Sequence, residues 1–200
     1  KGYAGALARL NRSGIALITM PYEPPPELTG LSLAEIAALV EARRIPPVDS
    51  WQPGRRGDSE MRIAADGRWF HQGGEIRRPA MVRAFSSLLR RDGDGRHWLV
   101  TPQEMLEIAV DDAAFIAIDL VSEGDALAFR LNTGDTVIAG PDHPIIARGD
   151  PDVPALYLAV RHGCEARLNR STYGQLIELA LAGGGLTVTS QGAQFSLVPA

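Results

Sequence analysis

Cysteine is almost missing from this sequence, since Cys164 is the only thiol in a chain of 200 residues. A single thiol excludes an internal disulfide framework and a zinc site built from several thiolates. The four histidines, His71, His97, His143 and His162, show none of the i, i+2 or i+4 spacings that are typical of metal-binding pairs. The sequence therefore predicts no metal site and no bound cofactor.

The glycine motifs that bind phosphate or expose a nucleophile are missing as well. The chain contains no G-x-x-x-x-G-K loop, no G-x-G-x-x-G fingerprint and no G-x-S-x-G elbow. ATP hydrolysis by a P-loop, dinucleotide binding by a Rossmann fold and hydrolysis by an elbow serine are therefore without support. We find no catalytic residue, so the sequence favours a protein that is not an enzyme without deciding the question.

Strong positive charge and long apolar runs are also lacking. The chain has 20 Lys and Arg against 24 Asp and Glu, a net charge of −4, which argues against coating nucleic acid or an anionic membrane. The apolar run at residues 14–20 is too short to span a bilayer, and we find no targeting segment. We expect a cytoplasmic protein that does not enter the membrane and in which any anion site is local.

The sequence does contain a 45% hydrophobic fraction, which is enough for the core of one large or two small domains. Residues 1–58 are expected to form an N-terminal arm and a helix. Prolines at residues 24–26 predict an extended arm, and Ser32 with Glu35 forms a capping box for an amphipathic helix over residues 31–44. Residues 51–58, rich in Gly, Pro and Arg, indicate a loop.

Residues 59–104 predict a first α+β half. Asp66-Gly67 forms a hairpin turn between strands at residues 61–63 and 69–70, and a third short strand is expected near residues 75–77. Pro79 then opens a helix whose apolar residues follow the 3.6 period as far as the next Asp-Gly turn. A strand at residues 98–100 is expected to complete this half.

Residues 105–200 predict a second half with the pattern of an antiparallel sheet or small barrel. An alternating strand over residues 106–110 is followed by expected strands at 115–121, 126–131 and 136–139. A hairpin around His162-Gly163 leads into a helix that Asn169 or Ser171 caps and that runs to residue 182. Two last strands are expected at residues 186–189 and 194–198.

A weak repeat relates the two halves. Three residues near the first hairpin recur ninety positions later, where Gly73, Glu75 and Arg77 match Gly163, Glu165 and Arg167. Each set ends a hairpin that leads into an amphipathic helix. Duplication of an α+β unit is one interpretation and chance is the other, because the matches are few. Under duplication, two related halves meet at an interface, where ligand pockets are common.

Several short motifs follow one another in order along most of the chain. They are Asp66-Gly67-x-Trp69-Phe70-x-x-Gly73-x-x-Ile76-x-Arg78-Pro79, Leu99-Val100-Thr101-Pro102-x-Glu104, Val110-x-Asp112-Ala113-x-Phe115, Gly140-Pro141-Asp142-His143-Pro144, Tyr157-x-x-Val160-Arg161 and Ala166-x-x-x-Arg170-x-x-Tyr173. Together they resemble the uncharacterised bacterial domain-of-unknown-function family 1285, with departures at Ala80, Ala114 and Ile145. The resemblance implies a duplicated α+β core, a second half like a pleckstrin-homology-type barrel with a helix near its C-terminus, and a site for a nucleotide-like signalling ligand between the halves. It implies no established enzyme activity.

Two arginines at the start of the helix that Pro79 opens are the first candidates for ligand binding. Arg77 and Arg78 combine guanidinium groups with helix N–H groups and the positive end of the helix dipole, which suits an anion. Salt bridges to carboxylates such as Glu75 are the simpler alternative. By the repeat, Arg161 and Arg78 are expected to face a common cleft.

Four further residues complete the candidate site. Trp69 offers a ring on which a base can stack, although burial of this ring in the core is the simpler alternative. Thr101 is a candidate contact whose simpler role is a cap. Asp142 and His143 form a pair in a proline-bracketed turn, where a metal-ligand role is disfavoured, and His143 is the best titratable group near the expected cleft.

Three functions remain open. The favoured one is a cytoplasmic regulatory protein that binds a small anionic or nucleotide-like ligand between its halves, in signal transduction. A protein-protein adaptor that uses an exposed strand edge or the proline-rich arm predicts a flat apolar patch instead. An uncharted hydrolase predicts a carboxylate within hydrogen-bond reach of His143 and a shifted pKa.

Overall fold

The computed structural model describes residues 9–10, 16–17, 46 and 48–199. Near the start, β1 (Arg9–Leu10) pairs antiparallel with β2 (Ala16–Leu17). The arm expected at residues 24–26 and the helix expected at residues 31–44 lie outside the described residues. The next described element is the short 3-10 helix η1 (Val48–Ser50), whose first residue is buried.

The first half forms a six-stranded sheet in the order β5-β4-β3-β8-β7-β6. Its strands are β3 (Arg55–Ile63), β4 (Trp69–His71), β5 (Gly74–Glu75), β6 (Leu89–Arg91), β7 (His97–Val100) and β8 (Glu104–Val110). β3 and β8 run parallel at the centre, and the other neighbours are antiparallel. The strand expected over residues 106–110 is confirmed as β8. The loop expected over residues 51–58 is wrong from Arg55 onward, because this segment pairs with β8.

A short helix, α2 (Pro79–Ser86), connects β5 to β6 and begins at the predicted proline. Its Phe85 stacks on Trp69 of β4, with ring centres 6.3 Å apart and ring planes 19° from parallel. The helix ends well before the Asp-Gly turn at which we expected it to end. The Ser86 hydroxyl donates to the Arg83 carbonyl oxygen in the last turn, and the chain then enters β6, which pairs with β7.

The second half forms another six-stranded sheet, in the order β11-β10-β9-β14-β13-β12. Its strands are β9 (Phe115–Glu123), β10 (Ala126–Leu131), β11 (Thr136–Ile138), β12 (Ile145–Asp150), β13 (Val153–Arg161) and β14 (Cys164–Leu168). β9 and β14 are parallel, so this sheet is mixed where an antiparallel one was expected. β12 is an unpredicted strand, because only its first three residues are apolar.

The two sheets have the same strand order, which confirms the prediction of two related α+β halves. In each half the first strand pairs in parallel with the sixth, while the second and third strands lie on one side and the fourth and fifth on the other. The predicted ninety-residue match is wrong in detail. Gly73 lies between the second and third strands of its half, whereas Gly163 lies between the fifth and sixth.

Three elements complete the second half: α3 (Arg170–Ala182), β15 (Thr187–Ser190) and β16 (Ala193–Ser196). Asn169 caps α3, one of the two alternatives predicted, and its Oδ1 accepts a 2.8 Å hydrogen bond from the Thr172 N–H. β15 and β16 form a hairpin that contacts β10 through β15 and β12 through β16. The hairpin thus joins strands from the two sides of the second sheet.

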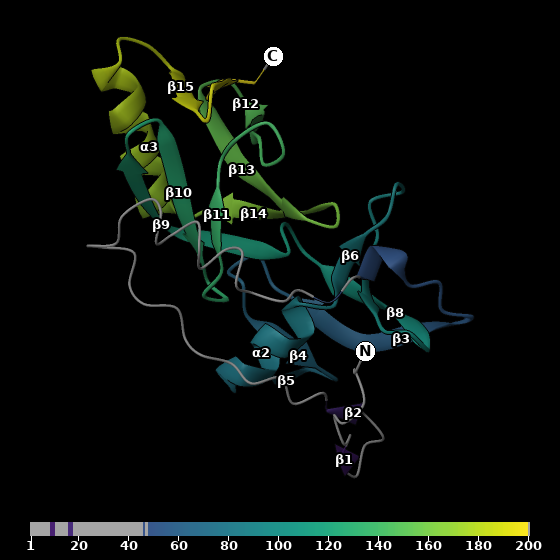
Figure 1. Ribbon diagram of the computed structural model, residues 1–200. Coiled ribbons are helices and arrows are strands. Elements are labelled where there is room, and N and C mark those ends of the chain that lie inside the picture. The colour runs from purple at the N-terminus through teal and green to yellow at the C-terminus, as the bar shows by residue number, and fades with distance from the viewer. Residues whose placement is uncertain (1–8, 11–15, 18–45, 47, 200) are drawn as a thin grey trace.

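The two halves are stacked one above the other and share one apolar core (Figure 1). The buried cluster includes Trp69 and Leu89 of the first half together with Phe115, Phe129 and Leu158 of the second. The first sheet continues past residue 104, where we expected the second half to begin, and ends with β8 at residue 110. In the part of the chain that the structure describes, no helix is both long enough and apolar enough to cross a membrane.

Candidate ligand-binding site between the two halves

A small charged pocket lies where the two sheets meet. The first half contributes Arg91 of β6 and His97 of β7, and the second half contributes Arg148 of β12, Tyr157 of β13 and Glu165 of β14. The lining also includes the connection between the halves, at residues 112–114. The cavity has a volume of about 160 Å³. Ionisable groups from both halves gather around this cavity.

Glu165 is the central anion of the pocket and is held mainly by Arg148. The Arg148 guanidinium donates to both Glu165 oxygens, over 2.7 and 2.5 Å. Arg91 stands further off, with Nη1 4.0 Å from Glu165 and Nε 3.5 Å from the carbonyl oxygen of Gly95. Because these two contacts of Arg91 are long, its guanidinium has the geometric freedom to turn toward an anion in the pocket.

Tyr157 forms a wall whose polar end is fixed by hydrogen bonds. Its hydroxyl donates to Asp112 over 2.7 Å, and Arg167 of β14 donates to the other Asp112 oxygen over 2.7 Å and to the Tyr157 oxygen over 3.1 Å. The guanidinium carbons of Arg148 and Arg167 lie 4.7 and 5.3 Å from the ring centre. Burial and the bond to Asp112 raise the pKa of Tyr157, so the phenol stays protonated.

The formal charges that line the pocket are balanced. Arg91 and Arg148 stand against Asp112 and Glu165, and Arg167 bonds to Asp112 without lining the cavity. Burial, and then the charge of Arg91, lower the pKa of His97, so this imidazole is neutral at neutral pH. Among the described residues, no group of three or more His, Cys, Asp or Glu side chains is placed to hold a metal ion. Because Arg148 is bound to Glu165 and the contacts of Arg91 are long, Arg91 is the lining group that a small anion can engage.

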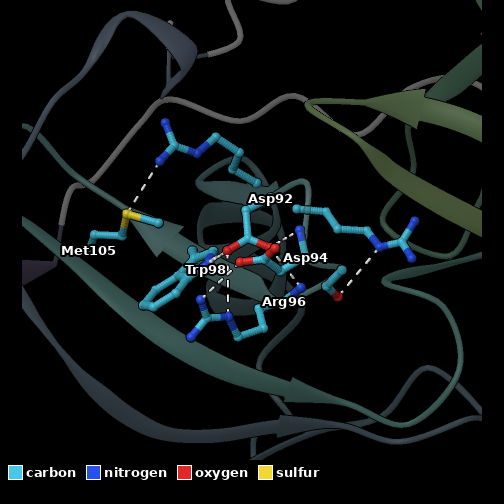
Figure 2. Close-up of polar contacts among 8 residues, drawn as sticks. Asp92, Asp94, Arg96, Trp98 and Met105 are labelled. Atoms are coloured by element: carbon cyan, nitrogen blue, oxygen red, sulfur yellow. Dashed lines mark hydrogen bonds and ion pairs between the residues drawn. The ribbon is translucent and has the colours of Figure 1, made fainter.

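The turn between β6 and β7 fixes the first-half wall of the pocket. Figure 2 shows Asp92 at the centre of this turn, between Arg96 and Trp98. The Asp92 carboxylate accepts hydrogen bonds from the Trp98 indole over 2.8 Å and from the Arg96 backbone N–H over 2.9 Å. The bond from Trp98 is the main cause that lowers the pKa of Asp92. Arg91 and His97 lie on either side of this turn, so the hydrogen bonds of Asp92 help to fix the positions of both residues.

The anion site predicted at the start of α2 lacks most of its donors. The first helical residue is a proline without an N–H, and the N–H groups of Met81 and Val82 both donate to the Arg78 carbonyl oxygen. Arg78 itself is exposed and forms no side-chain cap. Arg77 lies 3.2 Å from Glu75, which is the salt bridge named as the simpler alternative. This end of the helix therefore offers little that an anion can bind.

Two other predicted residues have structural contacts. Trp69 is 1% exposed and stacks on Phe85, so its ring is not available to a ligand. The Thr101 hydroxyl donates to the Glu104 carbonyl oxygen over 3.2 Å and accepts from the Glu104 N–H over 3.1 Å. Trp69 is thus a core residue and Thr101 caps a turn, which are the simpler alternatives given for each.

Asp142 and His143 lie in the turn between β11 and β12, where residue 143 bridges back to Gly140. Asp142 is exposed. The His143 Nδ1 atom lies 3.1 Å from the Ala159 carbonyl oxygen, so this nitrogen is the one that carries the proton. The contact ties the turn to β13, which is a structural role for His143.

Arg161 is buried between the halves, away from Arg78. Its Nη2 lies 3.2 Å from both Asp135 and the carbonyl oxygen of Ser86, and its guanidinium carbon lies 4.7 Å from the Phe115 ring centre. Burial lowers the pKa of Arg161 to about 10, which leaves it charged at neutral pH. Arg161 therefore contacts the last residue of α2, whereas Arg78 precedes the first, and the helix between them is about 12 Å long.

None of the seven predicted residues, Trp69, Arg77, Arg78, Thr101, Asp142, His143 and Arg161, lines the pocket. Arg91 was missed because the helical pattern of α2 continues into β6, so that residue 91 was expected to lie at the end of the helix. Arg148 was missed because the strand β12 was not predicted. A signal did exist for the others. Asp112 and Tyr157 belong to the ordered motifs, and Glu165 belongs to the residues that were compared across the halves.

Comparisons with known proteins point to one family across both halves. The N-terminal domain model described as "Domain of unknown function (DUF1285)" matches residues 46–113, and the C-terminal domain model described as "Protein of unknown function (DUF1285)" matches residues 114–197. The chain is similar to the crystal structure of a DUF1285 family protein from Silicibacter pomeroyi DSS-3, with 41% identity and a TM-score of 0.70 over 84% of this chain and 94% of that one.

A second crystal structure, of a DUF1285 family protein from Shewanella baltica OS155, is 22% identical, with a TM-score of 0.49 over 59% of this chain and 90% of that one. No match is found among curated proteins. The division between the two matched domains, at residues 113 and 114, falls in the short connection between β8 and β9.

Proposed function

Because the chain belongs to the DUF1285 family, whose function is unknown, we propose from its pocket that it is a cytoplasmic regulatory protein that binds a small anionic ligand in signal transduction. The observation that carries this proposal is the meeting of Arg91 from the first half with Arg148 and Tyr157 from the second around one cavity. Guanidinium groups bind phosphate and carboxylate through paired N–H donors.

The size of the cavity limits which ligands it can enclose. Pockets for drug-sized molecules measure roughly 300–1,000 Å³, whereas this one measures about 160 Å³. Its volume favours a phosphate group or a short carboxylate over an enclosed nucleotide. A nucleotide-like ligand would place its phosphate here and leave its base outside. The neutral His97 adds a group that can donate a hydrogen bond to the anion without a charge of its own.

A regulatory role is supported by the origin of the lining residues in both halves. A ligand that contacts Arg91 on β6 and Arg148 on β12 bridges the two sheets, so it stabilises the arrangement in which both arginines face the pocket. A ligand shifts an equilibrium between arrangements by its difference in affinity for them. The bound anion would thus control how firmly the halves hold together.

We also propose that the second half is of the pleckstrin-homology type, with α3 packed beside β9 and the β15–β16 hairpin joining β10 to β12 as support. An adaptor function is supported by the strand edge of β15 that faces away from β16. The hydrolase alternative finds less, because the Nδ1 atom of His143 contacts the Ala159 carbonyl oxygen and not a carboxylate.

A thermal-shift comparison tests the anion site. We expect inorganic phosphate or a nucleoside monophosphate to stabilise the protein, by about 2.7 kcal/mol at one hundred times the dissociation constant. Because phosphate also stabilises proteins non-specifically, the decisive comparison is between variants. Arg91→Gln is expected to lose the specific shift, whereas Arg77→Gln, which removes the same charge from an exposed salt bridge, is expected to keep it. Equal shifts in both variants would contradict the proposal.

A further inference from the structure

We propose that the free edge of β15 is a docking site for an extended, positively charged segment of a partner protein. This site is separate from the pocket between the halves. It lies at the far end of the second half, where α3 turns into the β15–β16 hairpin (Figure 1). The proposal rests on four features of this region: a groove, an open strand edge, an exposed leucine in the groove and nearby negative charge.

The groove runs along β15 and has a volume of about 410 Å³. One wall comes from Leu127 of β10 and Leu179 of α3, and the other from Thr187 and Thr189 of β15. Residues 183–185, three consecutive glycines, line the end where α3 stops. Glycines carry no side chain, so they leave the approach to the strand edge open.

The edge of β15 that faces away from β16 carries backbone groups ready to pair. In the described sheets β15 has one strand neighbour, β16, with Val188 opposite Phe195 and Thr189 opposite Gln194. The Leu197 N–H donates to the Leu186 carbonyl oxygen, so residues 186, 188 and 190 direct their backbone groups toward β16. In an antiparallel pair the alternate residues point the other way. The N–H and C=O groups of residues 187 and 189 therefore face away from β16.

An exposed apolar side chain lies in the groove beside this edge. Leu179 of α3 lines the groove and is 39% exposed. Leu181 and Leu186 are also exposed but do not line it, and residues 179 and 181 lie on different sides of the helix because they are two positions apart. An added strand pairs with the edge through its backbone and covers Leu179 with one of its side chains.

The charge around the groove selects the partner. The residues that line the groove are uncharged. The segments that contain them, residues 120–129 and 171–199, carry three carboxylates, Glu123, Asp125 and Glu178, and their first Lys or Arg neighbours in the chain are Arg130 and Arg170. A segment with Lys or Arg on either side of its strand-forming residues is therefore favoured. A second copy of this chain would bring the same three negative charges to the same place, which disfavours self-pairing of β15.

Fluorescence anisotropy with designed peptides tests this site in the full chain. The probe is a labelled nine-residue peptide in which threonine and valine alternate over five residues, with two lysines at each end. We expect it to bind at least tenfold more tightly than the same peptide with glutamates at its ends. We also expect it to bind at least tenfold more tightly than a lysine-flanked peptide whose alternate backbone nitrogens are methylated. Equal binding of the three peptides, or no binding, would overturn the proposal.

Two variants locate the binding on β15. Thr189→Pro removes an N–H that does not pair with β16, so it blocks the edge while keeping the hairpin, and we expect at least tenfold weaker binding. Glu178→Lys leaves the backbone unchanged and is expected to weaken the lysine-flanked peptide and strengthen the glutamate-flanked one. Glu107→Lys, the same change at an exposed position of β8, is the control and is expected to alter neither. Unchanged binding in Thr189→Pro and Glu178→Lys, or a chain dimer that Thr189→Pro abolishes, would overturn the assignment to a partner segment.

Discussion

Gly163 in the second half lies against the backbone of Arg91 in the first. A Cβ atom on Gly163 would be 2.8 Å from the Arg91 carbonyl oxygen, and Gly163 has a φ of 75°, which side-chain-bearing residues rarely adopt. One residue away, the Arg91 N–H donates to the His162 carbonyl oxygen over 2.8 Å. The β13–β14 turn is therefore docked on the edge strand β6, and the absence of a side chain at residue 163 permits this contact.

Gly163→Ala is expected to lower the free energy of unfolding by about 3 kcal/mol, since it adds backbone strain and a contact with a backbone oxygen that cannot move freely. Gly73→Ala is the matched control, because Gly73 has a φ of 79° but a Cβ atom added there would meet no atom of the described residues within 4 Å. Strain alone is expected to destabilise this variant by about 1 kcal/mol. Urea unfolding of both variants measures the difference, and equal losses would show that the contact with Arg91 contributes nothing.

Arg161→Met is expected to destabilise the protein by about 3–5 kcal/mol, because it removes a buried ion pair with Asp135 and the hydrogen bond to the Ser86 carbonyl oxygen. Arg77→Met, which breaks an exposed ion pair with Glu75, is expected to change stability by less than about 1 kcal/mol. Urea unfolding compares the two. If Arg161→Met is as mild as Arg77→Met, the buried pair with Asp135 within the second half contributes little to stability.

The pKa of the His97 imidazole is expected to depend on the charge of Arg91. Arg91→Gln should raise the pKa of His97 toward its ordinary value without restoring it fully, because burial, the larger cause, remains. An anion bound in the pocket should raise the pKa of His97 as well. Titration of the imidazole by NMR measures both effects, with Arg77→Gln as the variant that should leave this pKa unchanged.

The same pKa shift predicts a direction for stability against pH. In the unfolded chain this histidine takes up a proton near its ordinary pKa of 6.5, whereas in the folded protein it stays neutral to a lower pH. Stability due to this group is therefore fully present above 6.5 and decreases as the pH falls below it. Arg91→Gln should weaken this decrease. A steeper decrease in Arg91→Gln than in the native chain would refute the assigned cause.

Trp98→Phe is expected to raise the pKa of Asp92, since the indole hydrogen bond is the main cause that lowers it. In the native chain the stabilisation from ionised Asp92 is present above its ordinary pKa of 3.8 and is lost as the pH falls through its lower folded value. Carboxyl NMR titration measures the change. The pKa of Asp66, lowered chiefly by the Arg68 backbone N–H, serves as the internal reference and should stay the same.

Local signals in the sequence predicted much of each half. Asp66-Gly67 marked the turn between β3 and β4, Pro79 marked the start of α2, and Asn169 marked the cap of α3. The pairing of β3 with β8 and of β9 with β14 was beyond such signals, because parallel partners lie far apart in the chain and no turn residue links them. This pairing also explains why residues 55–58 are strand and not loop.

The candidate site was harder to predict than the fold. An interface between two halves was expected, yet its residues were sought at the hairpin around Trp69 and at the start of α2. The observed pocket combines Arg91 from an edge strand of one sheet with Arg148 from an edge strand of the other. Which edges meet depends on how two whole sheets pack, and no residue pattern within either strand expresses that packing.

The parallel centre of each sheet determines where the chain enters and leaves each half. Because the first and sixth strands of a half run in the same direction, the chain enters the half at one end of this central pair and leaves it at the opposite end. Four residues, 111–114, therefore suffice to join the last strand of the first half to the first strand of the second. Two such halves follow one another in the chain without a long linker.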